Sequence, residues 1–219
     1  MQNDDHDDVA PKVNQAPARG RPRAFDREKA LAQAMRAFWS KGFEATSISD
    51  LKEAMGISSP SLYAAFGSKE ALFAEAIRYY VDTVGSDAWA SFRSAPTVRA
   101  AVETYLGITA AALSGSTCDT PRGCMVTLSS VATEGYEQLG ELVRAERASF
   151  LNSLKARLED AVEVGELRAT TDVHTLSRFV QAVLSGMSIL ARDGATREEL
   201  EAVVKTAMLG WDTFLEKLD

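Results

Sequence analysis

Apolar residues recur at three- and four-residue spacing around residue 50, which predicts a short amphipathic helix. Ser47 and Asp50 stand three residues apart at its start, the pattern of a capping box, and Gly56 follows its last turn, where a left-handed backbone favours glycine. A second short helix is predicted to have Ser59 as its N-cap and Pro60 at its first helical position. Two short helices joined by a tight glycine turn predict a helix-turn-helix, the unit that places its second helix in the major groove of DNA.

The same periodicity predicts helices along the rest of the chain, and we find no strand-like alternation. The predicted helices span 25–41, 69 towards 89, 97–113, about 121–133 after Thr120-Pro121, 136–164, and two C-terminal stretches within 176–190 and 196–215. Gly42, Gly67 and Gly165 are predicted to end helices, and Ser68 to cap the one that follows it. The fold class is therefore predicted to be all-α, with an N-terminal three-helix helix-turn-helix domain and a C-terminal helical domain.

Charge is distributed unevenly along the chain. The formal net charge is -7, but residues 1–18 carry -3, residues 19–78 carry +3 and residues 79–219 carry -7. The basic surplus falls on the predicted helix-turn-helix and on Arg19, Arg21 and Arg23 before it, as expected when one domain approaches phosphates. We predict three parts: a disordered tail with a basic arm (1–22), a helix-turn-helix domain (23–68) and a helical domain (69–219). The arginine arm suits phosphate contact or a narrow minor groove, and a solvated linker is the alternative.

The last two predicted helices are apolar over more of their surface than one core edge usually needs. A homodimer formed through a four-helix bundle would bury both faces. The predicted dimer-interface residues are Phe179, Val183, Leu184, Val204, Met208, Trp211 and Leu215.

Residues Thr46 to Phe73 resemble the DNA-binding domain of the TetR family of transcriptional regulators. The resemblance lies in the Gly-Ile-Ser-x-x-Ser-Leu-Tyr core and the Phe-Gly-Ser-Lys-Glu-Ala-Leu-Phe that follows it, and it covers roughly residues 25–80. It implies an all-helical ligand-binding and dimerisation domain in the remainder, and a function as a dimeric transcriptional regulator, most often a repressor released from its operator by a small-molecule effector.

The second helix of the motif carries hydroxyl side chains as its hydrogen-bonding groups and lacks long polar side chains. Ser58, Ser59, Ser61 and Tyr63 can form hydrogen bonds, whereas no Arg, Lys, Asn or Gln lies on this helix to make a bidentate base contact. The resemblance implies that Thr46 and Lys69 contact phosphates, that Tyr63 reaches the DNA backbone, and that Ser59, Pro60 and Ser61 face the bases. Ala64 and Ala65 depart from the polar residues common in relatives, so specificity is expected to rest partly on the arm and on DNA shape.

A cavity for the effector is predicted between the helices of the second domain, chiefly from the resemblance. Its candidate lining residues are aromatic or soft, although such residues at helical spacing also form ordinary core. The candidates are Trp89, Phe92, Tyr105, Cys124, Met125, Leu128, Phe150, Phe179 and Met187.

Cys118 and Cys124 flank a Pro-Arg-Gly sequence near a predicted helix start. A thiol near a helix N-terminus and an arginine can have a lowered pKa, and the two thiols could pair, so a redox- or electrophile-sensing regulator of the same fold is the alternative function. A small, buried, unreactive cysteine is the commoner case.

Several other classes are excluded by what the sequence lacks. With His6 and His174 as the only histidines there is no finger-type zinc spacing, and no nucleophile elbow, phosphate loop or zinc-protease motif is present. We therefore predict no enzyme activity, no metal and no cofactor. The chain has no apolar run of about 18 residues and no signal-peptide pattern, which predicts a cytoplasmic protein without a membrane partner. A helical adaptor that binds only protein would show no salt-sensitive DNA binding.

Overall fold

A computed structural model describes residues 26–116, 120–129 and 135–216. These residues form ten helices and no strand, which confirms the predicted all-α fold. In chain order they are α1 (Arg27–Lys41), α2 (Ile48–Met55), α3 (Ser59–Phe66), α4 (Lys69–Thr83), α5 (Ser86–Ser94), α6 (Val98–Leu113), α7 (Met125–Leu128), α8 (Glu137–Glu163), α9 (Val173–Arg192) and α10 (Arg197–Glu216). The predicted tail, Arg19, Arg21, Arg23 and Cys118 lie outside the described residues.

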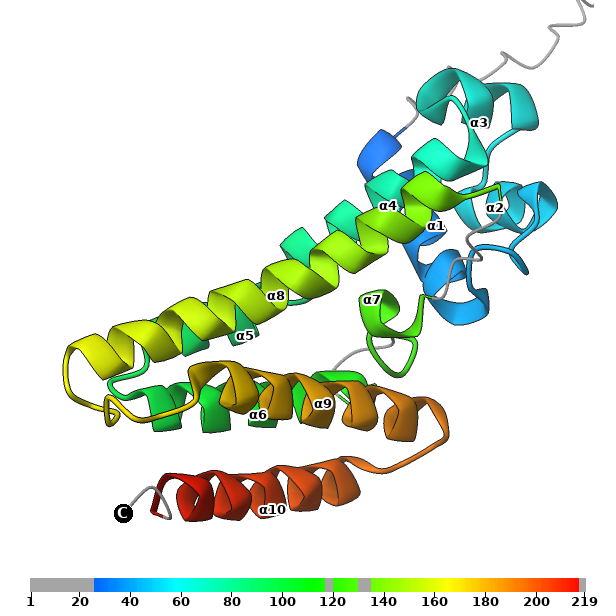
Figure 1. Cartoon of the computed structure of the whole chain (residues 1–219). Helices are drawn as coiled ribbons and strands as arrows, with labels where there is room; N and C mark the ends of the chain where they lie inside the picture. The colour runs from blue at the N-terminus through cyan, green and yellow to red at the C-terminus, as the bar shows by residue number, and fades with distance from the viewer. Residues whose placement is uncertain (1–25, 117–119, 130–134, 217–219) are drawn as a thin grey trace, which may run out of the picture.

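Helices α1 to α4 form a small unit at one end of an elongated molecule (Figure 1). Its core is aromatic: the ring of Phe73 packs edge-on against Phe38 and Phe43, with ring centroids 5.2 and 5.1 Å apart. Leu51 from α2 and Leu62 from α3 are fully buried in the same core. Because α3 buries Leu62 in the same core as α1 and α4, its packing against these two longer helices fixes its orientation.

The local signals at the helix ends act largely as predicted. Ser47 and Asp50 form a reciprocal capping box, and the carboxylate of Asp50 also accepts a 2.6 Å hydrogen bond from Lys41 Nζ. These partners hold the pKa of Asp50 well below its usual range. Gly56 takes the left-handed conformation that ends α2. One boundary differs, since Ser58 rather than Ser59 is the N-cap of α3 and accepts from the backbone N–H of Ser61, which places Pro60 one position further into the first turn.

The Ser47→Ala variant should lower the free energy of unfolding by about 1 kcal/mol, because it removes the acceptor for the Asp50 backbone N–H. In a chain of this size, that corresponds to a fall of about 2–4 °C in the melting temperature. Thermal unfolding followed by circular dichroism measures it. Ser94→Ala is the matched control, because the Ser94 hydroxyl donates to a carbonyl near the end of α5 and caps no helix start; an equal loss in both variants would contradict the capping role.

Two predicted helices are shorter than expected. The helix from Lys69 stops at Thr83, and a new one begins at Ser86, because Gly85 is a poor helix former and the Thr83 and Ser86 hydroxyls bond back to backbone carbonyls. Helix α7 begins at Met125 rather than after Pro121. Gly123 has a φ of +78°, which is not helical, and its N–H donates to the carbonyl of Leu113.

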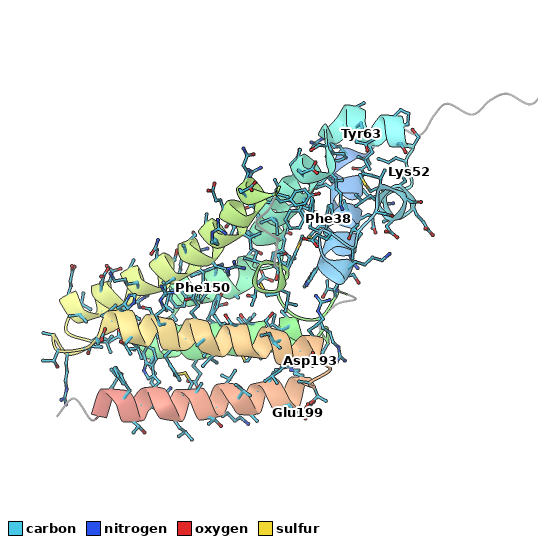
Figure 2. The ribbon with its side chains drawn as sticks, turned by 45° about the vertical axis from the view of Figure 1, so that its right-hand side comes forward. Phe38, Lys52, Tyr63, Phe150, Asp193 and Glu199 are labelled. Atoms are coloured by element: carbon cyan, nitrogen blue, oxygen red, sulfur yellow. The ribbon has the colours of Figure 1, made fainter. Side chains whose placement is uncertain are left out.

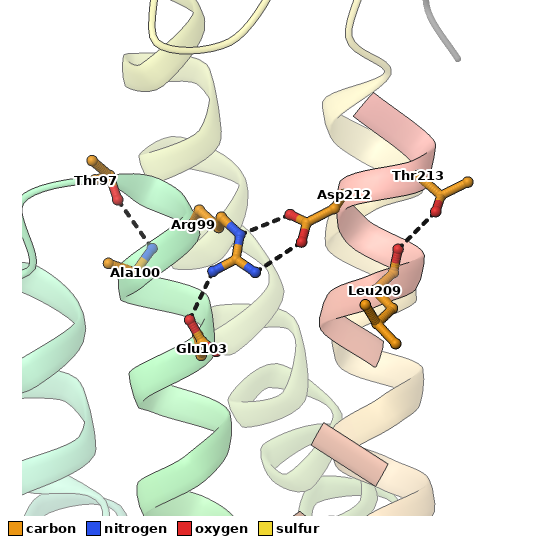
Figure 3. A network of polar contacts seen from close by, with 7 residues as sticks. All are labelled: Thr97, Arg99, Ala100, Glu103, Leu209, Asp212 and Thr213. Atoms are coloured by element: carbon orange, nitrogen blue, oxygen red, sulfur yellow. Dashed lines mark hydrogen bonds and ion pairs between the residues drawn. The ribbon is translucent and has the colours of Figure 1, made fainter. Parts of the chain in front are cut away.

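The larger part of the chain is a helical bundle. Helices α6, α9 and α10 pack against one another, while α8 runs alongside α4 and carries the chain back from the small unit (Figure 1). Arg99 on α6 donates to both carboxylate oxygens of Asp212 on α10, at 2.7 and 2.8 Å, and to Glu103 on its own helix (Figure 3). This exposed network sets α10 in register with α6, beside the buried ring of Trp211.

Candidate DNA-binding surface and ligand cavity

The N-terminal turn of α3 and one of its faces are open to solvent. Ser58, Pro60, Ser61 and Tyr63 are all exposed, Tyr63 by 47%, and Figure 2 shows Tyr63 at the outer tip of the small unit. The opposite face, with Leu62 and Phe66, is buried. The helix therefore presents hydroxyl groups and the positive end of its dipole outward, an arrangement suited to phosphates and groove edges.

The two residues predicted to contact phosphates already have partners inside the chain. Thr46 is fully buried, and its hydroxyl donates to the carbonyl of Gly42 at 2.6 Å. The ammonium of Lys69 lies 4.4 Å from the ring centroid of Phe43, a cation–π contact. Thr46 thus supports the turn before α2, and Lys69 is held beside the aromatic core at the start of α4; their predicted phosphate contacts stay predictions.

Arg27 ties α3 to its neighbours in a way that the sequence did not reveal. Its guanidinium lies 4.4 Å from the Phe66 ring centroid, donates to the carbonyl of Ala65 and pairs with Glu75 on α4 at 2.8 Å. The contacts fix the C-terminal end of α3 against α1 and α4. Only the spatial meeting of three helices shows this role, because the residues are far apart along the chain.

The bundle contains a half-open cavity of about 1500 Å³. Five of the nine predicted lining residues border it, namely Trp89, Phe92, Tyr105, Cys124 and Phe150. The four rings of Trp89, Phe92, Tyr105 and Phe150 form a cluster in which neighbouring ring centroids lie 5.0 to 5.7 Å apart. Figure 2 shows Phe150 within the bundle. Charged lining residues such as Glu103, Asp160 and Lys205 are exposed, so the cavity has an aromatic interior and a charged rim.

The other four predicted lining residues do not border the cavity. Met125 and Met187 are fully buried core residues, Leu128 packs beside Gly123, and Phe179 is partly exposed on the outer side of α9. These residues do recur at helical spacing, but each lies on a side of its helix that does not face the cavity.

Two aromatic residues of the cavity wall were missed, and both belong to the small unit. Trp39 on α1 and Tyr80 on α4 border the cavity, with ring centroids 4.9 Å apart. Their periodicity marked them only as core. Nothing in the sequence indicated that the small unit itself forms part of the cavity wall.

Cys124 is half-buried and lies against Tyr80, and its backbone N–H donates to the Ser188 hydroxyl at 2.8 Å. Burial raises the pKa of Tyr80, with the neighbouring thiol adding to the effect. Because Cys118 lies outside the described residues, the structure gives no geometry for a pair of thiols.

The outer surface of α9 and α10 carries an apolar stripe. Phe179, Ile189 and Leu190 are exposed on α9, and Leu209 is 68% exposed on α10. Four small residues, Ala182, Gly186, Ala202 and Gly210, are also exposed there. Of the residues predicted for the dimer interface, Phe179 lies on this stripe and Val183, Leu184 and Leu215 are half-buried. Val204, Met208 and Trp211 are buried in the chain's own core, because α10 uses its other face against α6 and α9.

Among the described residues, no group of three or more His, Cys, Asp or Glu side chains is placed to hold a metal ion. No helix within the same ranges is long and apolar enough to cross a membrane.

Comparisons with known proteins agree with this architecture. A sequence model described as bacterial regulatory proteins, tetR family, matches residues 30–76, and one described as a tetracyclin repressor-like C-terminal domain matches residues 96–207. The HTH-type transcriptional repressor ComR of Escherichia coli (strain K12) is 34% identical over 89% of this chain and 92% of its own length. The repressor BdcR of the same strain is 31% identical, over 95% of this chain and all of its own length.

A solved structure gives the same result. A cysteine mutant of the TetR family transcriptional regulator CifR, complexed with 26 bp double-strand operator DNA, is 40% identical with a TM-score of 0.81. The match covers 86% of this chain and 98% of that one.

Proposed function

The chain belongs to the TetR family of transcriptional regulators, and from that premise we propose that it is a homodimeric repressor released from its operator by a small molecule. The observation that carries the DNA-binding part is the exposed first turn of α3, which places Ser58, Pro60, Ser61 and Tyr63 on one accessible surface. The relatives named as repressors, and the one solved with operator DNA, support it. Such a regulator acts on the chromosome, which is why we place it in the cytoplasm.

The mode of recognition follows from the side chains of α3. Hydroxyls and small residues give weak base readout, so positioning by phosphate contacts and DNA shape carries more of the affinity. Ser58 and Ser61 are paired with each other, with 2.9 Å between their oxygens, and each would exchange this partner for DNA.

The test is a gel shift with the DNA upstream of the protein's own gene. We expect binding at low salt that weakens steeply as salt rises, because neutralised phosphates release counterions. Absence of binding at low salt would contradict the repressor function. Binding that is independent of salt would contradict the phosphate contacts.

Tyr63→Ala should weaken operator binding by about 5- to 10-fold, since one backbone contact contributes on the order of 1 kcal/mol. Tyr63→Phe separates the hydroxyl from the ring. Fluorescence anisotropy with labelled operator measures both, and unchanged affinity in Tyr63→Ala would remove this residue from the DNA-binding surface. The side chain is exposed, so neither variant should change the melting temperature appreciably.

The dimer is proposed from the apolar stripe on α9 and α10. A monomer seldom exposes several large apolar side chains on one continuous face, and the small residues among them would let a second copy approach closely. Two α9 and α10 pairs would form a four-helix bundle. Two recognition helices held this way would enter successive major grooves about 34–36 Å apart.

The effector is proposed to bind in the cavity. Its aromatic interior fits an apolar or aromatic body, and its charged rim fits a polar group left near solvent. A saturating ligand at about 100 times its Kd should stabilise the protein by about 2.7 kcal/mol. A melting-temperature screen of small aromatic compounds detects this, and a compound that raises the melting temperature should also release the operator.

A further inference from the structure

The last turn of α1 is held by a side chain from the far end of α9. Arg192 donates from one terminal nitrogen to the carbonyl of Trp39 at 2.8 Å and from the other to that of Ser40 at 3.1 Å. These carbonyls lie at the negative end of the α1 dipole, where a cation is favourable. Two hydrogen bonds from one guanidinium thus tie α9 directly to the small unit of helices α1 to α4, the DNA-binding unit of the proposed function.

The Trp39 side chain makes a second connection from the same turn. Its Nε1–H donates to the carbonyl of Gly123 at 2.9 Å, and its ring packs edge-on against Tyr80. Trp39 is buried and borders the effector cavity. One residue of α1 thus contacts the cavity, the segment before α7 and, through its carbonyl, α9.

The segment that accepts this hydrogen bond is itself tied to α6 and α9. The Gly123 N–H donates to Leu113 at the end of α6, and the Cys124 N–H donates to the Ser188 hydroxyl on α9. A Cβ built on Gly123 would lie 2.5 Å from Leu128 Cδ1 and 2.7 Å from the Ser188 carbonyl oxygen. A shift of this segment by a bound molecule would therefore be passed on to Trp39.

We infer that Trp39, Gly123, Ser188 and Arg192 form a joint through which filling of the cavity changes the orientation of the DNA-binding unit. The inference rests on the proposed function and adds the route by which the effector acts. Trp39 and Arg192 are positioning residues: an occupant displaces the Trp39 ring or the Gly123 segment, and the hydrogen bonds that hold the α1 carbonyls re-form in another arrangement.

The joint is suited to switching because one of its polar groups is incompletely satisfied. The Arg192 Nε is buried and has no hydrogen-bond partner among the described residues, and burial lowers the pKa of this guanidinium. A rearrangement that gave Nε a partner would therefore offset part of the cost of releasing the two α1 carbonyls.

The experiment uses a built-in occupant in place of the unidentified effector. Ala112 borders the cavity one residue before Leu113, and Ala112→Phe adds a ring there. We expect Ala112→Phe to lower operator affinity about tenfold in the otherwise unchanged protein, within the usual range of allosteric coupling. In the Arg192→Gln or Trp39→Phe background, Ala112→Phe should lower operator affinity by less than about twofold, because the hydrogen bonds of the joint are no longer intact. Trp39→Phe keeps a ring and removes only the N–H, so it serves if Arg192→Gln folds poorly.

The controls separate this inference from the proposed function. Ala145→Phe makes the same change at an exposed position of α8 outside the cavity, and should leave affinity unchanged in every background. Equal losses for Ala112→Phe in all backgrounds, or no loss in any, would overturn the joint. If the unchanged protein bound no operator, the repressor function would fail by itself. The joint is then judged by hydrogen exchange, where Ala112→Phe must speed exchange of the last-turn amides of α1 only when Trp39 and Arg192 are intact.

Discussion

Leu209→Arg should convert the protein to a monomer and lower operator affinity by about 100-fold or more. Leu209 is 68% exposed on the apolar stripe of α10, and in the proposed dimer it would be buried against a second copy. An unpaired guanidinium there costs several kcal/mol of desolvation in each half of a symmetric interface. A monomer also loses the linkage between two half-sites, which contributes about 100- to 10,000-fold to overall affinity. Light scattering after gel filtration gives the mass, and a gel shift gives the affinity.

The matched control is Val164→Arg. Val164 is 77% exposed at the end of α8 and does not lie on the stripe, so the same change there should leave both mass and operator affinity unchanged. A Leu209→Arg protein that stays dimeric would move the interface elsewhere. A monomer that keeps full affinity would show that the recognition helices do not act as a linked pair.

The part of the fold that could be predicted from sequence is the part determined by local chemistry. The Ser47–Asp50 box, the left-handed Gly56 and the cap at Ser68 each depend on residues within one turn, and the structure has all three. The misplaced cap of α3 shows the limit of such signals. Ser58 and Ser59 are both good caps, and the choice depends on how Leu62 reaches the core.

For features that depend on tertiary packing, the sequence predicted that an apolar surface exists but not which residues lie on it. The sequence indicated that the last two helices are apolar over much of their surface, but not which side of α10 turns inward. Trp211 and Met208 pack within the chain, while Leu209 between them faces out. A helical pattern gives the angle between residues and not the direction of the neighbouring helix. The same reason explains why Met125 and Met187 were expected at the cavity and are core instead.

Trp39 could not be assigned beyond the core for a further reason. Its role depends on Gly123 and Arg192, which follow it by 84 and 153 residues. Contacts at that separation depend on where the end of α9 lies relative to α1, which no local signal encodes. The resemblance in residues 46–73 predicted the DNA-binding unit well, but it contained no information about how that unit is held against the bundle.

Phe73→Ala should be the most destabilising of the variants considered, with a loss of about 3–5 kcal/mol in the free energy of unfolding. Phe73 is fully buried and its ring contacts those of Phe38 and Phe43, so truncation removes two aromatic pairs and leaves a cavity in the core that carries α3. Because α2 and α3 bury two residues each in that core, we expect operator binding to be lost along with the ordered DNA-binding unit. Chemical denaturation measures the stability, and a gel shift measures the binding.

Phe73→Leu is the matched control, since it keeps most of the apolar volume and should cost less than half as much while retaining operator binding. The comparison also tests how the two parts of the chain are coupled. If the whole chain unfolds in one transition, Phe73→Ala lowers a single midpoint. If the joint at Trp39 and Arg192 is the main link, the DNA-binding unit melts first and the bundle keeps its own midpoint. A Phe73→Ala protein that binds operator as tightly as the unchanged chain would show that α3 is oriented by contacts other than the α1–α4 core.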